Sequence, residues 1–304
     1  MTRSLALLLL AVVGPAAHAQ SGHYAPLVAQ LPVGAQALGM GGWNASSRDV
    51  DAALGNPAYA GSLASTSLSL ARYADRVNGG AISNQSTIGV IGIAIGASYL
   101  DYGASTPTLQ ARGFSGDVLA ERGPFAAASL TGGIAVSTTF KGFRLGVAGL
   151  YLEERVESTR SSVAAASVGA SKDVFTGRVR LGLAVQNIGP DLNAPSGAIE
   201  LPTRVALGAT GPLIAIGSYL DLFLSGGIAI QRDGFLSGGA GGELSYVPIE
   251  GISLAVRAGA RRPELRAPQP ITLGLGAAYD RLAIDYAWEQ MDGGGAHRVS
   301  LRLR

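Results

Sequence analysis

The sequence predicts an all-β protein: a transmembrane antiparallel β-barrel of about 14 strands, preceded by an N-terminal segment that folds into the lumen as a hatch or plug. Three observations predict this fold class. The composition is apolar and rich in glycine, apolar and small residues alternate from about residue 65 to the end, and the connections between these alternating segments are long and short in turn.

The composition is unlike that of a soluble enzyme. Hydrophobic residues make up 47% and charged residues 14% of the 304 residues, and glycine occurs 44 times, whereas soluble domains average about 25% charged residues and about 7% glycine. A membrane barrel has such a composition because one face of each strand is apolar against lipid and small residues line the other. The net charge of +2 is too small to indicate a nucleic-acid partner. The absence of cysteine excludes disulfides, thiolate zinc sites and a cysteine nucleophile.

The N-terminus has the pattern of a secretory signal peptide. Arg3 supplies the positive charge, Leu5 to Val13 form a short apolar run, and residues 17–19 read Ala-His-Ala. We expect residues 1–19 to be removed by cleavage before Gln20. The apolar run is shorter than the ~20 residues of a spanning helix, which disfavours the alternative of an uncleaved anchor. No later apolar run is long and unbroken enough for a membrane helix, so the exported chain is expected in the bacterial outer membrane as a barrel.

Alternation with a period of two defines the strands. From residue 179 to 185, valine or leucine at every odd position alternates with arginine, glycine and alanine. Because successive strand side chains point to opposite faces, each such segment has one apolar face and one small or polar face. The barrel is expected to occupy residues 65–304. Its strands are expected to begin near Ser65, Gly79, Ile88, Phe125, Phe143, Ser161, Arg178, Thr203, Tyr219, Phe235, Ile252, Ile271, Arg281 and His297.

The connections predict which end of the barrel faces which side. Outer-membrane barrels have long outer loops and short periplasmic turns, so the odd-numbered connections are expected to be extracellular. The long odd-numbered connections are 101–124, 189–202, 261–270 and 290–296, the short even-numbered ones are 141–142, 171–173, 248–251 and 279–280, and 211–218 is a long exception. The aromatic residues expected near strand ends, as in an interfacial girdle, are Tyr99, Tyr219, Tyr246, Tyr279 and Trp288.

Residues 20–64 lack the alternation and form the expected hatch. Its motif consists of Gly39, Met40, Gly41, Gly42, Asp49, Asp51, Asn56, Pro57 and Ala58. Proline restricts its own φ and the residue before it, and asparagine favours turns, so Asn56–Ala58 is expected to be a structural turn, with a gating role as the alternative. Asp49 and Asp51 are expected to cap a helical turn or to pair with lumenal arginines. Two carboxylates are too few to define a calcium site.

Eight arginines fall on the face opposite the apolar one. A lipid-exposed arginine near the midplane costs roughly 2–4 kcal/mol, so these side chains are expected to point into the lumen. We expect them to pack against the hatch and to pair with acids such as Asp221, Glu243 and Asp285, and the alternative is an electropositive lumen that attracts anionic ligands. The eight lumenal arginines are Arg144, Arg178, Arg180, Arg204, Arg257, Arg281, Arg298 and Arg302.

Patterns that carry catalysis are weak in this sequence. Only His23 and His297 follow the signal peptide, far apart and without cysteine, so convergent metal ligands are not expected. Residues 113–116 lack the spacing of a nucleophile elbow, and the glycines at 39–42 lie between no expected strand and helix, as a dinucleotide loop would require. We therefore expect no enzyme activity and no cofactor.

Four stretches resemble the PorV/PorQ family, which belongs to the FadL-like outer-membrane barrels. They are residues 34–42 with Asp49–Asp51 and Asn56–Ala58, residues 186–189 with 201–202, residues 242–246 with 254–259, and residues 285–288 with 295–301. The resemblance implies a 14-stranded barrel with an N-terminal hatch. Such barrels usually end in an aromatic residue, whereas this chain ends Leu301–Arg304.

The resemblance implies two kinds of role. Some family members serve type IX protein secretion, which implies secretion-system subunits or secreted cargo as partners. FadL relatives pass hydrophobic small molecules through the barrel, which implies a hydrophobic ligand. We rank secretion or surface delivery slightly above uptake, with a structural barrel without transport as the third alternative. Outer-membrane lipid is the partner expected in every case.

Overall fold

The computed structural model describes residues 24–42, 53–73, 77–105, 110–112, 118–121, 125–194, 197–262, 271–291 and 294–304. The expected signal peptide and the hatch residues Asp49 and Asp51 lie outside the described residues. Within the described ranges, no helix is long and apolar enough to span a membrane.

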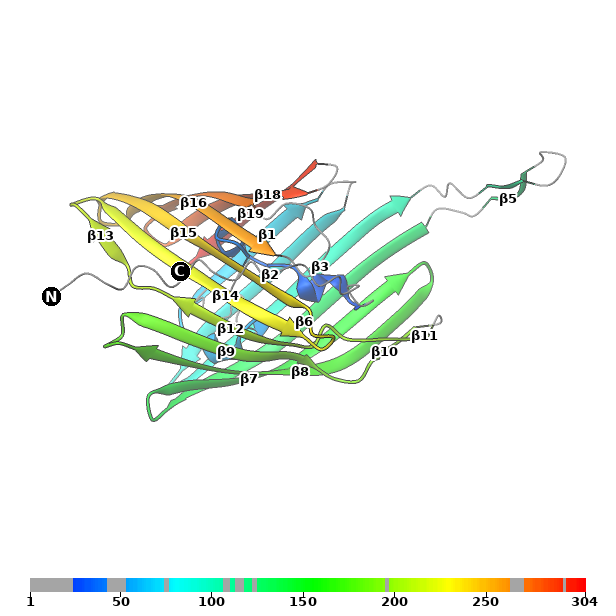
Figure 1. Cartoon of the computed structure of the whole chain (residues 1–304), viewed down its shortest axis with the longest axis horizontal. Coiled ribbons are helices and arrows are strands. Elements are labelled where there is room, and N and C mark those ends of the chain that lie inside the picture. Colours follow the sequence, from blue (N-terminus) through cyan, green and yellow to red (C-terminus); the bar gives the residue numbers. More distant parts are fainter. Residues whose placement is uncertain are drawn as a thin grey trace.

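Fourteen strands form one closed antiparallel sheet (Figure 1). The first strand pairs with the last, with Thr66 opposite Leu303 and Arg72 opposite His297, so the wall closes on itself. The predicted fold class is confirmed, and every predicted strand start lies within three residues of the observed one. The barrel strands are β1 (Ser65–Arg72), β2 (Asn78–Ile88), β3 (Ile91–Ser105), β6 (Phe125–Phe140), β7 (Phe143–Val156), β8 (Thr159–Val174), β9 (Val179–Ile188), β12 (Arg204–Thr210), β14 (Leu220–Gln231), β15 (Leu236–Ile249), β16 (Ile252–Arg262), β17 (Ile271–Tyr279), β18 (Leu282–Met291) and β19 (Gly294–Leu303).

Short strands that the alternation did not predict lie in the connections. Residues 211–218, the exception to the connection rule, contain β13 (Ile214–Ile216), which pairs with β14 beyond the end of β12. Gly211 and Pro212 separate β12 from β13, and proline has no N–H for a strand ladder. The long connections hold two small hairpins, β4 (Gln110–Arg112) with β5 (Val118–Glu121) and β10 (Leu192–Ala194) with β11 (Gly197–Ile199).

Two predictions about connections are wrong. The turn expected at 171–173 lies at Phe175–Arg178, because β8 continues to Val174 and the turn begins with left-handed residues at 175–177. The connection expected to be long at 290–296 is limited to 292–293, because β18 and β19 extend into it.

The two ends of the barrel differ in their connections. We call the end with turns 89–90, 141–142, 250–251 and 280–281 the turn end. The opposite end, with connections 106–124 and 189–203, is the loop end.

The outer face of the wall is apolar. Leu183 is 45% exposed and Val147 is 54% exposed, whereas their inward neighbours Ala184 and Ala148 are buried. Exposed aromatic side chains flank this belt, and on β7 they are Phe143 towards the turn end and Tyr151 towards the loop end. The eight residue steps from Phe143 to Tyr151, at ~3.4 Å per residue, give the belt a length of about 27 Å along the strand. With a tilt of ~35–45° the belt is about 19–22 Å tall, close to the ~25 Å apolar band of membrane barrels.

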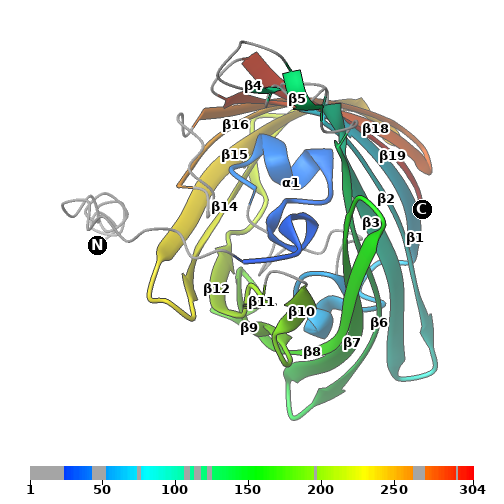
Figure 2. The same ribbon diagram turned by 90° about the vertical axis from the view of Figure 1, so that its right-hand side faces the viewer.

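The N-terminal segment lies inside the barrel (Figure 2). We call residues 24–42 and 53–64 the lumenal segment. It contains the short helices η1 (Leu27–Gln30), α1 (Ala35–Gly39) and η3 (Pro57–Tyr59). Helix α1 packs against β16 to β19, and η3 packs against β6, β7 and β8. The two parts of the lumenal segment therefore contact different arcs of the wall.

Candidate functional site

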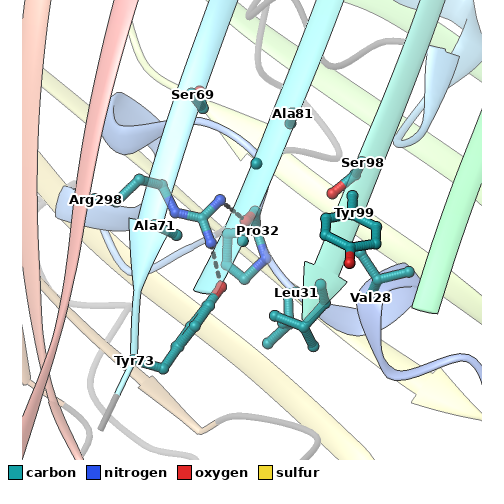
Figure 3. A pocket seen from close by; sticks show the side chains of 13 residues that line it. Val28, Leu31, Pro32, Ser69, Ala71, Tyr73, Ala81, Ser98, Tyr99 and Arg298 are labelled. Atoms are coloured by element: carbon teal, nitrogen blue, oxygen red, sulfur yellow. Dashed lines mark hydrogen bonds between the residues drawn. The ribbon is translucent and has the colours of Figure 1, made fainter. Parts of the chain in front are cut away.

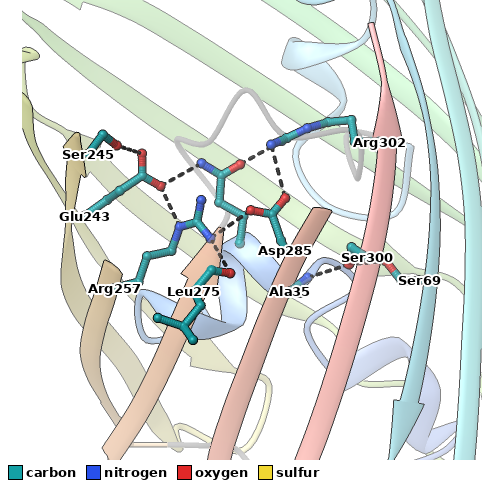
Figure 4. Close-up of polar contacts among 10 residues, drawn as sticks. Ala35, Ser69, Glu243, Ser245, Arg257, Leu275, Asp285, Ser300 and Arg302 are labelled. Carbon is teal, nitrogen blue, oxygen red and sulfur yellow. Dashed lines mark hydrogen bonds and ion pairs between the residues drawn. The ribbon is translucent and has the colours of Figure 1, made fainter. Parts of the chain in front are cut away.

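Five polar side chains form a closed ring where α1 meets the wall (Figure 4). Gln36 of α1 donates its Nε2 to Glu243 Oε2 at 3.1 Å and accepts at Oε1 from Arg302 at 2.6 Å. Arg302 lies 3.3 Å from one oxygen of Asp285, and Arg257 lies 2.8 Å from the other oxygen. Arg257 Nε closes the ring at 2.5 Å from Glu243 Oε2. We call these residues the lumenal ring.

Strand register and one glycine explain the lumenal ring. Glu243 on β15 is directly opposite Arg257 on β16, and Asp285 on β18 is opposite Gly276 on β17. A Cβ at Gly276 would lie 2.7 Å from a guanidinium nitrogen of Arg257 and 2.8 Å from Asp285 Oδ1, so glycine at this position leaves the space in which the ion pair crosses β17, and a larger residue would displace the two side chains. All four charged side chains of the ring are at most 14% exposed.

The lumenal ring holds two arginines and two carboxylates, so its formal charges cancel. This balance disfavours an electropositive lumen at this position and agrees with the alternative in which arginines pair with Glu243 and Asp285. Buried ion pairs contribute little net stability but are costly to break, because the remaining partner stays buried and unpaired. Gln36 therefore attaches α1 to strands β15 and β19 of the wall.

Wall side chains also bind the backbone of the lumenal segment. Arg298 donates to the carbonyl of Pro32, and its other nitrogen donates to the Tyr73 hydroxyl (Figure 3). The first nitrogen also donates to the carbonyl of Val33. The amide of Ala35 donates to Ser300 Oγ at 2.9 Å. Irregular backbone inside a barrel lacks a ladder partner, and buried amides and carbonyls need partners of some kind. The inner wall supplies these partners for residues 32–35.

Inward-facing glycines of the wall, which we call the glycine seats, leave space for the backbone of the lumenal segment to approach closely. A Cβ at Gly146 would lie 2.5 Å from the amide nitrogen of Ala58, and a Cβ at Gly92 would lie 2.7 Å from the carbonyl carbon of Ala60. On the opposite arc, a Cβ at Gly241 would lie 2.7 Å from the backbone of Met40. Much of the glycine enrichment on the inner face is therefore explained by close approach of the lumenal segment.

The turn at Asn56 is fixed to the wall. Asn56 Oδ1 accepts from Ala58 N at 3.0 Å, and its Nδ2 donates to Leu183 O at 3.3 Å. Gln186 of β9 donates to Gly55 O at 3.0 Å, and Ser137 of β6 donates to Ala60 O at 2.7 Å. These contacts support a structural role for the Asn56–Ala58 motif.

The predicted lumenal arginines occupy three kinds of environment. The expected pairing with Asp49 and Asp51 stays a prediction, because both acids lie outside the described residues. Within the described residues, Arg257 pairs with Glu243 and Arg298 donates to the carbonyl of Val33. Strands β9 and β18 begin one residue after the arginines at 178 and 281, so the alternation does not extend to these two. Buried arginines are Arg257, Arg298 and Arg302; half-buried ones are Arg144, Arg180 and Arg204; Arg178 and Arg281 lie in exposed turns.

A partly open pocket lies between η1 and the wall (Figure 3). Its enclosed part has room for about one water molecule, and the rest of the hollow is open to solvent. Most of its lining is apolar or lacks a side chain, and consecutive residues of β2 border it. The apolar and glycine lining consists of Val28, Leu31, Pro32, Ala71, Gly79, Gly80, Ala81 and Leu100, and the remainder consists of Ser69, Tyr73, Ser98, Tyr99 and Arg298. Sequence reasoning missed this pocket, because its lining comes from an irregular segment and from the four strands β1, β2, β3 and β19.

Comparisons with known proteins identify the fold. Neither a protein-family model nor a curated protein sequence matches the chain. The chain is similar in structure to the toluene transporter TodX of Pseudomonas putida, with a TM-score of 0.59, 11% identity, and coverage of 92% of this chain and 98% of that chain. It is also similar to the Ralstonia pickettii toluene transporter TbuX, with a TM-score of 0.55, 12% identity and coverage of 90% and 97%.

A third similar structure is the monoaromatic hydrocarbon channel CymD, with a TM-score of 0.56, 10% identity, and coverage of 90% of this chain and 96% of that chain. At such low identities the similarity shows the fold alone. The structural similarity does not confirm the resemblance to the PorV/PorQ family, which rests on the sequence motifs alone.

Proposed function

We propose that the chain is a passive channel for small hydrophobic molecules in the bacterial outer membrane. This proposal reverses the order expected from the sequence, in which protein secretion ranked above uptake. The observation that carries it is the mostly apolar pocket between η1 and strands β1 to β3, inside a barrel whose outer face is apolar. The similar structures described as hydrocarbon channels add support.

A channel of this kind needs only to bind the apolar surface of its solute and does not need to catalyse a reaction. Burial of apolar surface contributes about 25 cal/mol per Å². A small aromatic molecule therefore gains a modest affinity once the side chains around Val28, Leu31 and Leu100 move apart to admit it, because the pocket as it stands holds about one water molecule. Modest affinity suits a channel, because the molecule must also leave. The lumenal segment occupies the space that water and ions would otherwise cross, which favours a selective route over an open pore.

Uptake of radiolabelled toluene by cells that express the chain tests the proposal. Ala81→Phe places a ring into the pocket from β2, where Ala81 is 8% exposed, and we expect uptake to fall to near the level of cells without the chain. The matched control is Ala258→Phe, on the exposed outer face of β16, which should transport as the wild type does. Heat-modifiable gel mobility verifies that both variants fold.

Wild-type uptake equal to the background would overturn the proposal and favour a structural barrel without transport. Equal uptake by the two variants would show that the pocket is not on the route. The secretion role rests on the sequence resemblance alone, and co-purification of secretion subunits with the chain from outer membranes would revive it.

A further inference from the structure

Two arginines lie side by side on the outer face of the barrel. Arg155 of β7 is directly opposite Arg160 of β8. Both side chains point away from the lumen, since they alternate with inward residues such as the fully buried Leu152, and they are 56% and 58% exposed. Like charges directly opposite on neighbouring strands repel each other. The pair therefore needs counter-charge on the same face.

Glu153 supplies one counter-charge beneath the pair. Its side chain is only 1% exposed, and its two oxygens accept from Arg155 Nε and, at 2.8 Å, from Arg160 Nε. Tyr151 donates to the same carboxylate at 2.5 Å and accepts from Arg160 at 2.8 Å. These contacts hold both guanidinium groups in fixed orientations. These three side chains together carry a formal charge of +1, and the next acid along the chain after Arg155, Glu157, lies beyond them in the exposed turn between β7 and β8.

The cluster lies at the level where lipid headgroups meet the apolar belt. Tyr151 is the exposed aromatic residue at the loop-end edge of the belt on β7, and tyrosine hydroxyls at such edges lie among headgroups. The Arg160 guanidinium bonds to that hydroxyl, so it lies at the same depth. The nearest other acid on this face of strands β3 and β6 is Asp101, which accepts from the amide of Gly103 at 2.9 Å.

We propose that Arg155 and Arg160 bind the phosphate group of an anionic membrane lipid in the leaflet at the loop end. Guanidinium groups form paired hydrogen bonds with phosphate oxygens. Their exposed edges face the lipid side of the wall, while Glu153 orients them from below. The site lies on the opposite face of the wall from the pocket and the lumenal ring. The inference rests on the proposed membrane location but does not depend on transport.

Native mass spectrometry of the purified full chain in nonionic micelles tests this site. The probes are phosphatidic acid and, with the same acyl chains, zwitterionic phosphatidylcholine. We expect the wild type to retain phosphatidic acid in preference to phosphatidylcholine. The variant with Arg155→Gln and Arg160→Gln should bind phosphatidic acid about tenfold more weakly or worse, as expected for loss of charge-assisted hydrogen bonds.

A matched control removes the same charge elsewhere. Arg72 and Arg262 are exposed outward-facing arginines at the loop-end termini of β1 and β16, on separate strands. A variant with Arg72→Gln and Arg262→Gln should keep the wild-type affinity. An equal loss in this control, or a wild type without headgroup preference, overturns the proposal.

A third variant keeps the test decisive if the arginine variant fails to fold. Removal of both arginines leaves the buried Glu153 without a cation, so Glu153→Gln is added to Arg155→Gln and Arg160→Gln. This triple variant has no orphaned charge and should fold with the same loss of lipid binding. Retention of wild-type lipid affinity by the folded triple variant contradicts the assignment. Because the readout is lipid binding in micelles, its outcome is separate from that of the uptake assay.

Discussion

Gly146→Ala is expected to loosen the lumenal segment without damage to the wall. Gly146 faces inward from β7, and an added Cβ would lie closest to the carbonyl group of Pro57 and 2.5 Å from Ala58 N, so it is at least 0.9 Å short of the 3.4 Å at which ordinary contact begins. The obstacle is backbone on both sides, so η3 must move as a unit. A shift of this size stretches the hydrogen bonds at 3.3 Å from Asn56 to Leu183 O and at 3.0 Å from Gln186 to Gly55 O.

The expected magnitude follows from overpacking. Insertion of a methyl group into a tightly packed contact costs about 1–3 kcal/mol, which raises the undocked population roughly 5–150-fold. Hydrogen–deuterium exchange of the purified chain should then show faster exchange for the peptide that covers residues 53–62, while β7 and β8 exchange as before. In planar bilayers the same variant should show more frequent conducting events.

Gly149→Ala is the control on the same strand. Gly149 faces outward, and a Cβ there meets nothing within 4 Å. This variant should match the wild type in both assays. If Gly146→Ala also matches the wild type, or if both variants change equally, the inference that glycine seats hold the lumenal segment is refuted.

Three further predictions concern the ring, the belt and the topology. Arg257→Ala leaves Glu243 without a cation and takes one cation from Asp285, which keeps Arg302, and it should lower the free energy of unfolding by about 3–5 kcal/mol in urea titrations followed by tryptophan fluorescence; a loss below ~1 kcal/mol would show that the ring is dispensable. Leu183→Arg should cost roughly 2–4 kcal/mol on the apolar face, whereas Leu183→Ala should be milder, with refolding yield as the measure. Cysteine in place of Asp191 should react with an impermeant maleimide on intact cells, and cysteine in place of Lys141 should not; the reverse pattern would invert the topology.

The period of two made the barrel predictable. Alternation depends only on the geometry of single strands, so it located every wall strand between Ser65 and Leu303 within three residues of its start. The alternation wrongly placed Arg178 and Arg281 in the lumen, because both residues lie in turns just before a strand begins. It also gave no sign of β13, because a three-residue strand is too short to show a period.

The candidate sites were less predictable, because they depend on register between distant strands. The sequence suggested that arginines pair with Glu243 and Asp285, but the closure of the ring through Gln36 depends on the position of α1 in the lumen. The outward cluster at Glu153 was missed, since alternation places a carboxylate there on the lipid side without showing the cross-strand partner at Arg160. The same limit applies to the pocket beside η1.

The distance along the chain between the lumenal segment and its seats has a consequence for folding. The amide of Ala35 is bound by Ser300, 265 residues later, and α1 packs against β16 to β19. Closing so long a loop is entropically costly, and contacts of this range form late and slowly. The N-terminal part of the chain, which is synthesised first, is therefore expected to complete its docking only after β19 has formed. A defect in the last ten residues removes both the seam of the wall and the seat of α1, so truncation of β19 is expected to yield a chain with neither element in place.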